Sequence, residues 1–283
     1  MTNLTAITLR VGCEFSLLPE VSTHAVFQVE PRRAERAVLL QEKWTTDADL
    51  QRRSYRDGYG NLCERMDLPA GPSTIRYEAL VEVPPGLDDA DESAPEEPPS
   101  ALPDDVLIYT LPSRYCLSDE LGDEAWRLFG STAPGWGRVQ AICDHIHGNI
   151  AFQYGASSPL TTAVDIYKAG RGVCRDFAQL AVTFCRALNI PARYVFGYLP
   201  DIAIVPDGSP MDFCAWMEVW LGGRWYTFDP RNNQRRVGRV LIGRGRDALD
   251  CAMLTSYGNA ALQLMTVWAE EADPDPRPPG PSA

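Results

Sequence analysis

Hydrophobic and polar residues alternate along the first third of the chain. Between Thr5 and Leu18 every second position is apolar and most positions between them are polar. The same period returns over residues 25–29 and 75–83, and the run RDGYGN between them supplies turn residues. A period of two is typical of a strand that buries one face. The pattern therefore predicts a small antiparallel β domain over residues 1–83.

The spacing of apolar residues becomes helical after Asp119. Apolar side chains recur every three or four positions around residues 139–150, and again over residues 177–188. This spacing is typical of helices that bury one stripe. Two apolar runs follow, PARYVFGYLP and MDFCAWMEVWLGGRWYTFDPRNN, and the second predicts a hairpin around Gly222 and Gly223. The order of elements predicts an α+β core over residues 106–270.

Two segments have compositions that do not predict regular structure. Residues 84–105 contain eight acidic residues, no basic residue and many prolines, which predicts an extended, exposed linker. Residues 271–283 are rich in proline and predict a disordered tail.

Composition narrows the class of protein. The 283 residues are 45% hydrophobic and 23% charged, as in globular proteins, and no apolar run reaches the roughly 20 residues that cross a membrane. A formal net charge of −12 argues against a nucleic-acid partner. Eight cysteines form no C-x-x-C pair, and the N-terminus shows no secretory pattern. We therefore expect reduced thiols and a cytoplasmic location.

Cys174 stands at a position that favours a thiolate. It follows the run Gly170-Arg171-Gly172-Val173 and precedes the second helical stripe, so it falls in the first turn of a predicted helix. The positive end of the helix dipole and the free N–H groups there lower the pKa of a thiol. The same N–H groups could stabilise an oxyanion.

The register of the predicted hairpin brings a second thiol close to a carboxylate. With a two-residue turn at Gly222 and Gly223, Leu221 faces Arg224, and the strands then place Trp216 opposite Asp229. Cys214 and Asp229 become diagonal neighbours on one face, about 7–8 Å apart at the backbone.

The segments GRGVCRDFAQLAVTFCRALNIPARYVFGYLP and DFCAWMEVWLGGRWYTFDPRNN resemble the core of the bacterial transglutaminase-like superfamily, whose relatives include papain-like thiol enzymes. Residues 1–83 resemble, more weakly, the β domain that often precedes this core. The resemblance implies a Cys-His-Asp triad with Cys174 as nucleophile and Asp229 as the orienting carboxylate. Cys214 stands where the family has its histidine. The three histidines of the chain, His24, His145 and His147, fall elsewhere in the sequence.

A thiol is a poor general base beside another thiol, because its pKa lies near 8.5. Cys174, Cys214 and Asp229 could instead supply three ligands to a zinc-type ion that activates water. The predicted function is hydrolysis of an amide-type carbon–nitrogen bond in a small molecule or peptide. Three alternatives stay open: a metal-free thiol amidase, peptidase or acyltransferase that uses Cys174, a non-catalytic binding protein on the same fold, and a redox thiol pair.

Overall fold

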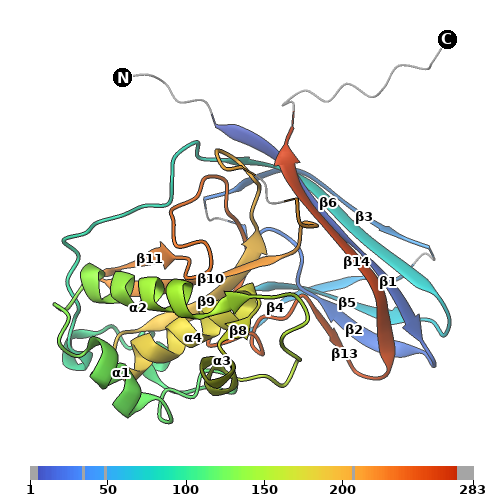
Figure 1. Cartoon of the computed structure of the whole chain (residues 1–283). Helices are drawn as coiled ribbons and strands as arrows, with labels where there is room; N and C mark the ends of the chain where they lie inside the picture. The colour runs from blue at the N-terminus through green and yellow to red at the C-terminus, as the bar shows by residue number, and fades with distance from the viewer. Residues whose placement is uncertain (1–5, 34–35, 48–49, 206–207, 273–283) are drawn as a thin grey trace.

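The computed structural model describes residues 6–33, 36–47, 50–205 and 208–272. Two regions lie side by side in Figure 1: a β region and a core that combines a sheet with helices. The predicted α+β fold class is confirmed. Among the described residues, no helix has both the length and the apolar character that a membrane crossing requires. The cytoplasmic location stays a prediction.

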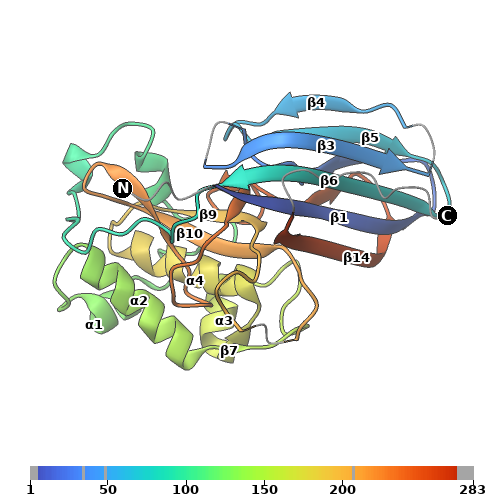
Figure 2. The ribbon, with the colours of Figure 1, turned by 90° about the horizontal axis from the view of Figure 1, so that it is seen from above.

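The β region consists of two four-stranded antiparallel sheets, with strand orders β14-β1-β6-β3 and β13-β2-β5-β4. Their strands are β1 (Ile7–Pro19), β2 (Thr23–Phe27), β3 (Val38–Thr46), β4 (Arg53–Arg56), β5 (Leu62–Leu68), β6 (Ser73–Val83), β13 (Leu254–Ser256) and β14 (Ala260–Glu271). The alternating apolar residues of β1 and β6 are buried in one core that both sheets share. The layered arrangement is visible from above in Figure 2. The predicted antiparallel strands are thus present.

The last strands of the chain belong to the β region and not to the core. β14 pairs with β1 along most of its length, and β13 pairs with β2. The predicted core boundary at residue 270 is therefore wrong, because these strands find their partners at the opposite end of the chain. The predicted tail begins at Glu271, which pairs with Leu9. Residues 273–283 lie outside the described residues.

The core packs four helices against one face of an antiparallel sheet with the order β11-β10-β9-β12. Its elements are α1 (Gly122–Phe129), α2 (Trp136–Asn149), α3 (Ala163–Ala169), α4 (Cys174–Ala187), β9 (Ala192–Tyr198), β10 (Cys214–Leu221), β11 (Arg224–Phe228) and β12 (Val240–Gly245). A short parallel pair, β7 (Ala151–Phe152) and β8 (Arg171–Gly172), precedes α4. The apolar stripe predicted for α4 is buried. The same face of the sheet extends into the core of the β region through Tyr194, Phe196 and Ala215, while Val195 and Trp216 form a separate small cluster on the opposite face.

The acidic segment between the two regions is exposed at most of its positions, but a few of its residues dock on the core. It contains the 3-10 turn η1 (Pro99–Ala101), with η2 (Leu107–Thr110) just after it, and it buries Ala94 and Leu102. Glu96 accepts from Arg138, and Asp88 is buried against arginines of the core. The sequence did not predict this docking, because composition alone does not reveal that buried arginines bind these carboxylates.

Candidate active site

Cys174 is the first residue of α4, as the sequence predicts. Asp176 fixes the start of the helix: its Oδ2 accepts from the backbone N–H of Val173 at 2.8 Å, and its own N–H donates to the carbonyl of Val173 at 2.8 Å. The first N–H groups of a helix have no partner within the helix. The Cys174 thiol therefore lies in the positive field of the helix start.

The hairpin carries Cys214 to the same place. Gly222 and Gly223 have φ values of 55° and 81°, which side chains other than glycine rarely adopt, and Leu221 pairs with Arg224. The ladder continues without a shift to Met217 and Phe228, so the predicted register is confirmed over this length. Cys214 begins β10 and pairs with Gly197 of β9.

Gly197 leaves room for this arrangement. A Cβ atom there would lie 2.1 Å from the carbonyl oxygen of Val240 and 2.9 Å from the ring of Trp216. The close approach of β9, β12 and the indole is possible only without a side chain.

Cys174 packs against the apolar cluster that contains Cys214 and Trp216. The hydrogen bond from Cys214 lowers the pKa of Cys174, burial opposes this, and the backbone N–H of Ala215 adds to the lowering. The hydrogen bond with Cys174, burial and the negative charge of Asp229 all raise the pKa of Cys214 well above its ordinary value. Together with the helix field, these effects make Cys174 the more acidic of the two thiols. Cys174 Sγ also lies 3.6 Å from the carbonyl oxygen of Phe213.

Asp229 lies close enough to Cys214 to influence its pKa, but its carboxylate is engaged elsewhere. Oδ1 accepts from the backbone N–H of Asn232 at 2.9 Å, and Oδ2 accepts from the Asn232 side chain at 2.7 Å and from Arg239 at 2.8 Å. Its side chain is 1% exposed and does not line the cleft that contains both thiols. Asp229 therefore anchors the loop after β11.

The residues present do not fit the predicted zinc-type site. Within the part of the chain that the structure describes, no three His, Cys, Asp or Glu side chains are placed to hold a metal ion. Asn232 and Arg239 occupy the oxygens of Asp229, and a cation beside Arg239 would meet its positive charge. The structure therefore does not support Cys174, Cys214 and Asp229 as a ligand set.

A cleft of about 1000 Å³ opens above Cys174. Its walls come from the core, from residues on both sides of 206–207, and from residues 248–255 ahead of and within β13. Asp212 and Arg231 line it, and their charges respectively raise and lower the pKa of Cys174. The Arg231 guanidinium lies 4.0 Å from the Phe152 ring centroid. The cleft is large enough for a peptide segment or a small molecule.

None of the three histidines, all of them in the described part of the chain, lines this cleft. His24 lies in β2 beside Asp67, at 2.6 Å. His145 and His147 lie in α2, and Nδ1 of His147 is 2.8 Å from the carbonyl oxygen of Arg231, on the outer side of the loop. None of these three histidines therefore lies where it could take the place of the triad histidine beside Cys174.

Asp88 and Arg239 hold Asp229 in place. The sequence analysis did not predict a role for either residue. Nε of Arg239 donates to Asp88 Oδ2 at 2.8 Å, while its Nη2 holds Asp229. Burial disfavours the charge of Arg239, but Asp229 and Asp88 outweigh it and raise its pKa. The signal available in the sequence is charge complementarity, since the acidic segment 84–105 faces a basic run over residues 231–239.

Comparison with known proteins places the chain in a family. The family model described as the transglutaminase-like superfamily matches residues 127–230. The crystal structure of a candidate cysteine protease from Cytophaga hutchinsonii is 30% identical, covers 97% of this chain and 93% of its own, and superimposes with a TM-score of 0.87. The chain therefore belongs to the transglutaminase-like superfamily.

Two mycobacterial proteins without an assigned function are also similar in sequence. A Mycobacterium tuberculosis protein is 29% identical over 265 residues, which cover 84% of this chain and 82% of the relative. A Mycobacterium leprae protein is 35% identical over 118 residues, which cover 40% of this chain and 42% of the relative.

Proposed function

We propose that the protein is a thiol hydrolase that cleaves an amide-type carbon–nitrogen bond, with Cys174 as nucleophile and Cys214 as proton donor. The observation that carries the proposal is the position of Cys174 at the start of α4, packed against the cluster of Cys214, with both thiols lining an open cleft. The similarity to a candidate cysteine protease supports a peptide or related amide as substrate.

The residues present provide for each step of such a reaction. The Cys174 thiolate attacks the acyl carbon, and the N–H groups at the start of α4 stabilise the oxyanion that forms. The carbon–nitrogen bond breaks as the amine takes the proton of the Cys214 thiol, which leaves a thioester on Cys174. Water then attacks the thioester and gives its proton to the Cys214 thiolate. The acid is released and the Cys174 thiolate is restored.

The raised pKa of Cys214 suits this exchange of protons. A thiol whose pKa lies well above neutrality stays protonated at neutral pH and is a strong base once it has lost its proton. Cys214 therefore donates and accepts the proton as the histidine does in the family's triad, but the pKa of its thiol is higher than that of an imidazole. An amine that enters the cleft in place of water would make the protein an acyltransferase, so the two activities differ only in the acceptor.

Acylation by an activated ester tests the proposal. We expect p-nitrophenyl acetate to acetylate Cys174 in a burst, with slower release of acetate, and peptide mass spectrometry to locate the acetyl group. Cys174→Ala removes the burst. Cys251→Ala is the matched control, because Cys251 lines the same cleft but burial raises its pKa well above the ordinary value, so it should not react.

Competing functions give different results in the same preparation. A primary amine can be added to the reaction with p-nitrophenyl acetate. If the amine becomes acetylated, the protein catalyses acyl transfer. Elemental analysis that finds about one metal ion per chain, lost in Cys214→Ala, supports the metal-dependent alternative. If wild-type protein is not acylated at Cys174, the proposed nucleophile is wrong and a binding role gains support.

A further inference from the structure

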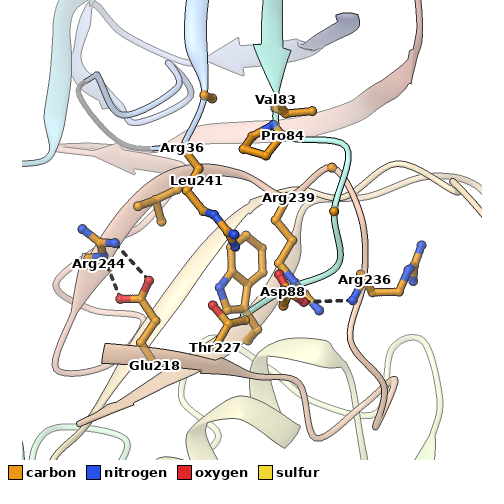
Figure 3. Close-up of a pocket in the computed structure, with 14 residues that line it drawn as sticks. Arg36, Val83, Pro84, Asp88, Glu218, Thr227, Arg236, Arg239, Leu241 and Arg244 are labelled. Carbon is orange, nitrogen blue, oxygen red and sulfur yellow. Dashed lines mark hydrogen bonds and ion pairs between the residues drawn. The ribbon is translucent and has the colours of Figure 1, made fainter. Parts of the chain in front are cut away.

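A second, smaller cavity shares Arg236 with the cleft and lies where the segment after β6 crosses the face of the core sheet that carries Trp216 (Figure 3). Its volume is about 60 Å³. Its lining contains four arginines and two carboxylates, which gives a formal charge of +2: Arg36, Arg236, Arg239, Arg244, Asp88 and Glu218. A positive lining is unexpected in a chain with a net charge of −12.

Two of these arginines keep a buried N–H group without an acceptor. The Arg239 side chain is 7% exposed; its Nε and Nη2 bind Asp88 and Asp229, while its Nη1 is buried without a hydrogen-bond partner among the described residues. The Arg236 side chain is 4% exposed; its Nη2 binds the carbonyl of Pro200, and its Nε has no partner within the same described residues. Buried donors in native proteins almost always have acceptors, so Nη1 of Arg239 indicates a bound acceptor in the cavity, whereas the Arg236 guanidinium is directed away from Arg239 in Figure 3.

The walls of the cavity would strengthen binding to an anion. The Arg239 guanidinium lies 4.8 Å from the centroid of the Trp216 ring, and Val83 and Leu241 add apolar surface. Charged hydrogen bonds are stronger where water is excluded. Figure 3 shows Arg36 reaching between Leu241 and Arg239, while Arg244 is held against Glu218.

Arg36 lies at the rim and is able to move. Its ion pair with Asp89, at 2.8 Å, joins two side chains that are 47% and 53% exposed. Such exposed pairs contribute little to stability, so Arg36 can exchange Asp89 for another anion at little cost.

We propose that this cavity binds one small oxyanion with the size and charge of inorganic phosphate or sulfate. A volume of about 60 Å³ exceeds the roughly 10–15 Å³ that one water needs. Guanidinium groups bind tetrahedral oxyanions through paired N–H donors. The anion would accept from Arg239 and Arg36 and would restrain Arg239 where it holds Asp229. The site does not depend on the proposed thiol chemistry, because neither Cys174 nor Cys214 lines it.

Thermal unfolding of the full chain tests this proposal. We expect inorganic phosphate to raise the melting temperature more than sodium chloride at equal ionic strength, and calorimetry to give about one site per chain. Arg36→Gln should weaken phosphate binding about tenfold, since it removes one charged donor at the rim. Arg239 is not replaced, because its loss would leave Asp88 and Asp229 unpaired.

Arg10→Gln is the matched control. Arg10 also makes an exposed ion pair at 2.8 Å, with Glu270, and both side chains are about half exposed, at 49% and 55%. Phosphate binding should be unchanged in this variant. Arg231→Gln, in the cleft, should also leave it unchanged. No phosphate-specific stabilisation of the wild type, an equal loss in Arg10→Gln, or a loss confined to Arg231→Gln would overturn the proposal.

Discussion

A cysteine in place of an imidazole changes the charge of the pair that we propose as catalytic. Thiolate and imidazolium together are neutral, whereas the Cys174 thiolate beside the Cys214 thiol carries one negative charge. The hydrogen bond, the N–H of Ala215 and the helix start must therefore stabilise that charge without a cation in direct contact. Asp212 opposes them and Arg231 assists them.

The pH dependence of alkylation measures this stabilisation. The hydrogen bond from Cys214 favours the charged form of Cys174 and lowers its pKa. Removing the donor in Cys214→Ala should raise that pKa, so the rate of reaction with iodoacetamide should rise with pH through a higher midpoint than in the wild type. At neutral pH the variant should react more slowly at Cys174.

Cys214→His should shift the midpoint of the alkylation rate in the opposite direction, toward lower pH. An imidazolium stabilises a thiolate by charge as well as by hydrogen bonding, so the midpoint should fall below that of the wild type. If Cys214→Ala leaves the midpoint unchanged, the thiol pair does not set the reactivity of Cys174, and the helix start alone accounts for it.

Among the elements, those with a clear period were predictable from the sequence. The alternation in β1, the stripe of α4 and the glycine turn of the hairpin are local patterns, and together they placed Cys174 and Cys214. The partners of Asp229 were not predictable, because Asn232 and Arg239 follow no period. The docking of the acidic segment depends in the same way on arginines far along the chain.

Asp88 tests the importance of that docking. Asp88 is 5% exposed and binds Arg239 through Oδ2, and the same oxygen accepts from the backbone N–H of Arg236. Asp88→Ala should destabilise the protein by about 3 kcal/mol, since Arg239 Nε and the backbone N–H of Arg236 would both lose their acceptor and Arg239 would keep only Asp229. Urea denaturation measures the change.

Glu92 in the same segment gives a control, because it is exposed. Glu92→Ala should unfold at nearly the wild-type urea concentration. Equal stability of the two variants would show that the segment behaves as the exposed linker that its composition predicts.

At the scale of the whole molecule, the two ends of the described chain meet in one sheet. Figure 1 shows β14 beside β1, and the pairing runs from Leu9 with Glu271 to Pro19 with Ala260. A β strand has no sequence signal that names its partner. The sequence therefore predicted strands at the N-terminus but not the strand that completes their sheet.

Truncation tests the contribution of β14. A chain that ends at Asn259 would expose the edge of β1. It would also lack Val267 and Ala269, whose side chains are buried in the core of the β region. We expect this protein to self-associate in size-exclusion chromatography and to lose cooperative thermal unfolding. A chain that ends at Ala272 retains β14 and should match the full chain; association of both would mean that β14 is not the cause.

The pairing of β14 with β1 also sets an order of events during translation. A ribosome makes β1 before β14, so the nascent chain carries an unpaired edge of β1 until β14 has been made. The thiol pair, α4 and the hairpin are all complete before β14 emerges. The core can therefore fold before β14 exists, whereas the sheet of β1 closes only once β14 has been made, and the nascent chain is most exposed to edge pairing with its neighbours until then.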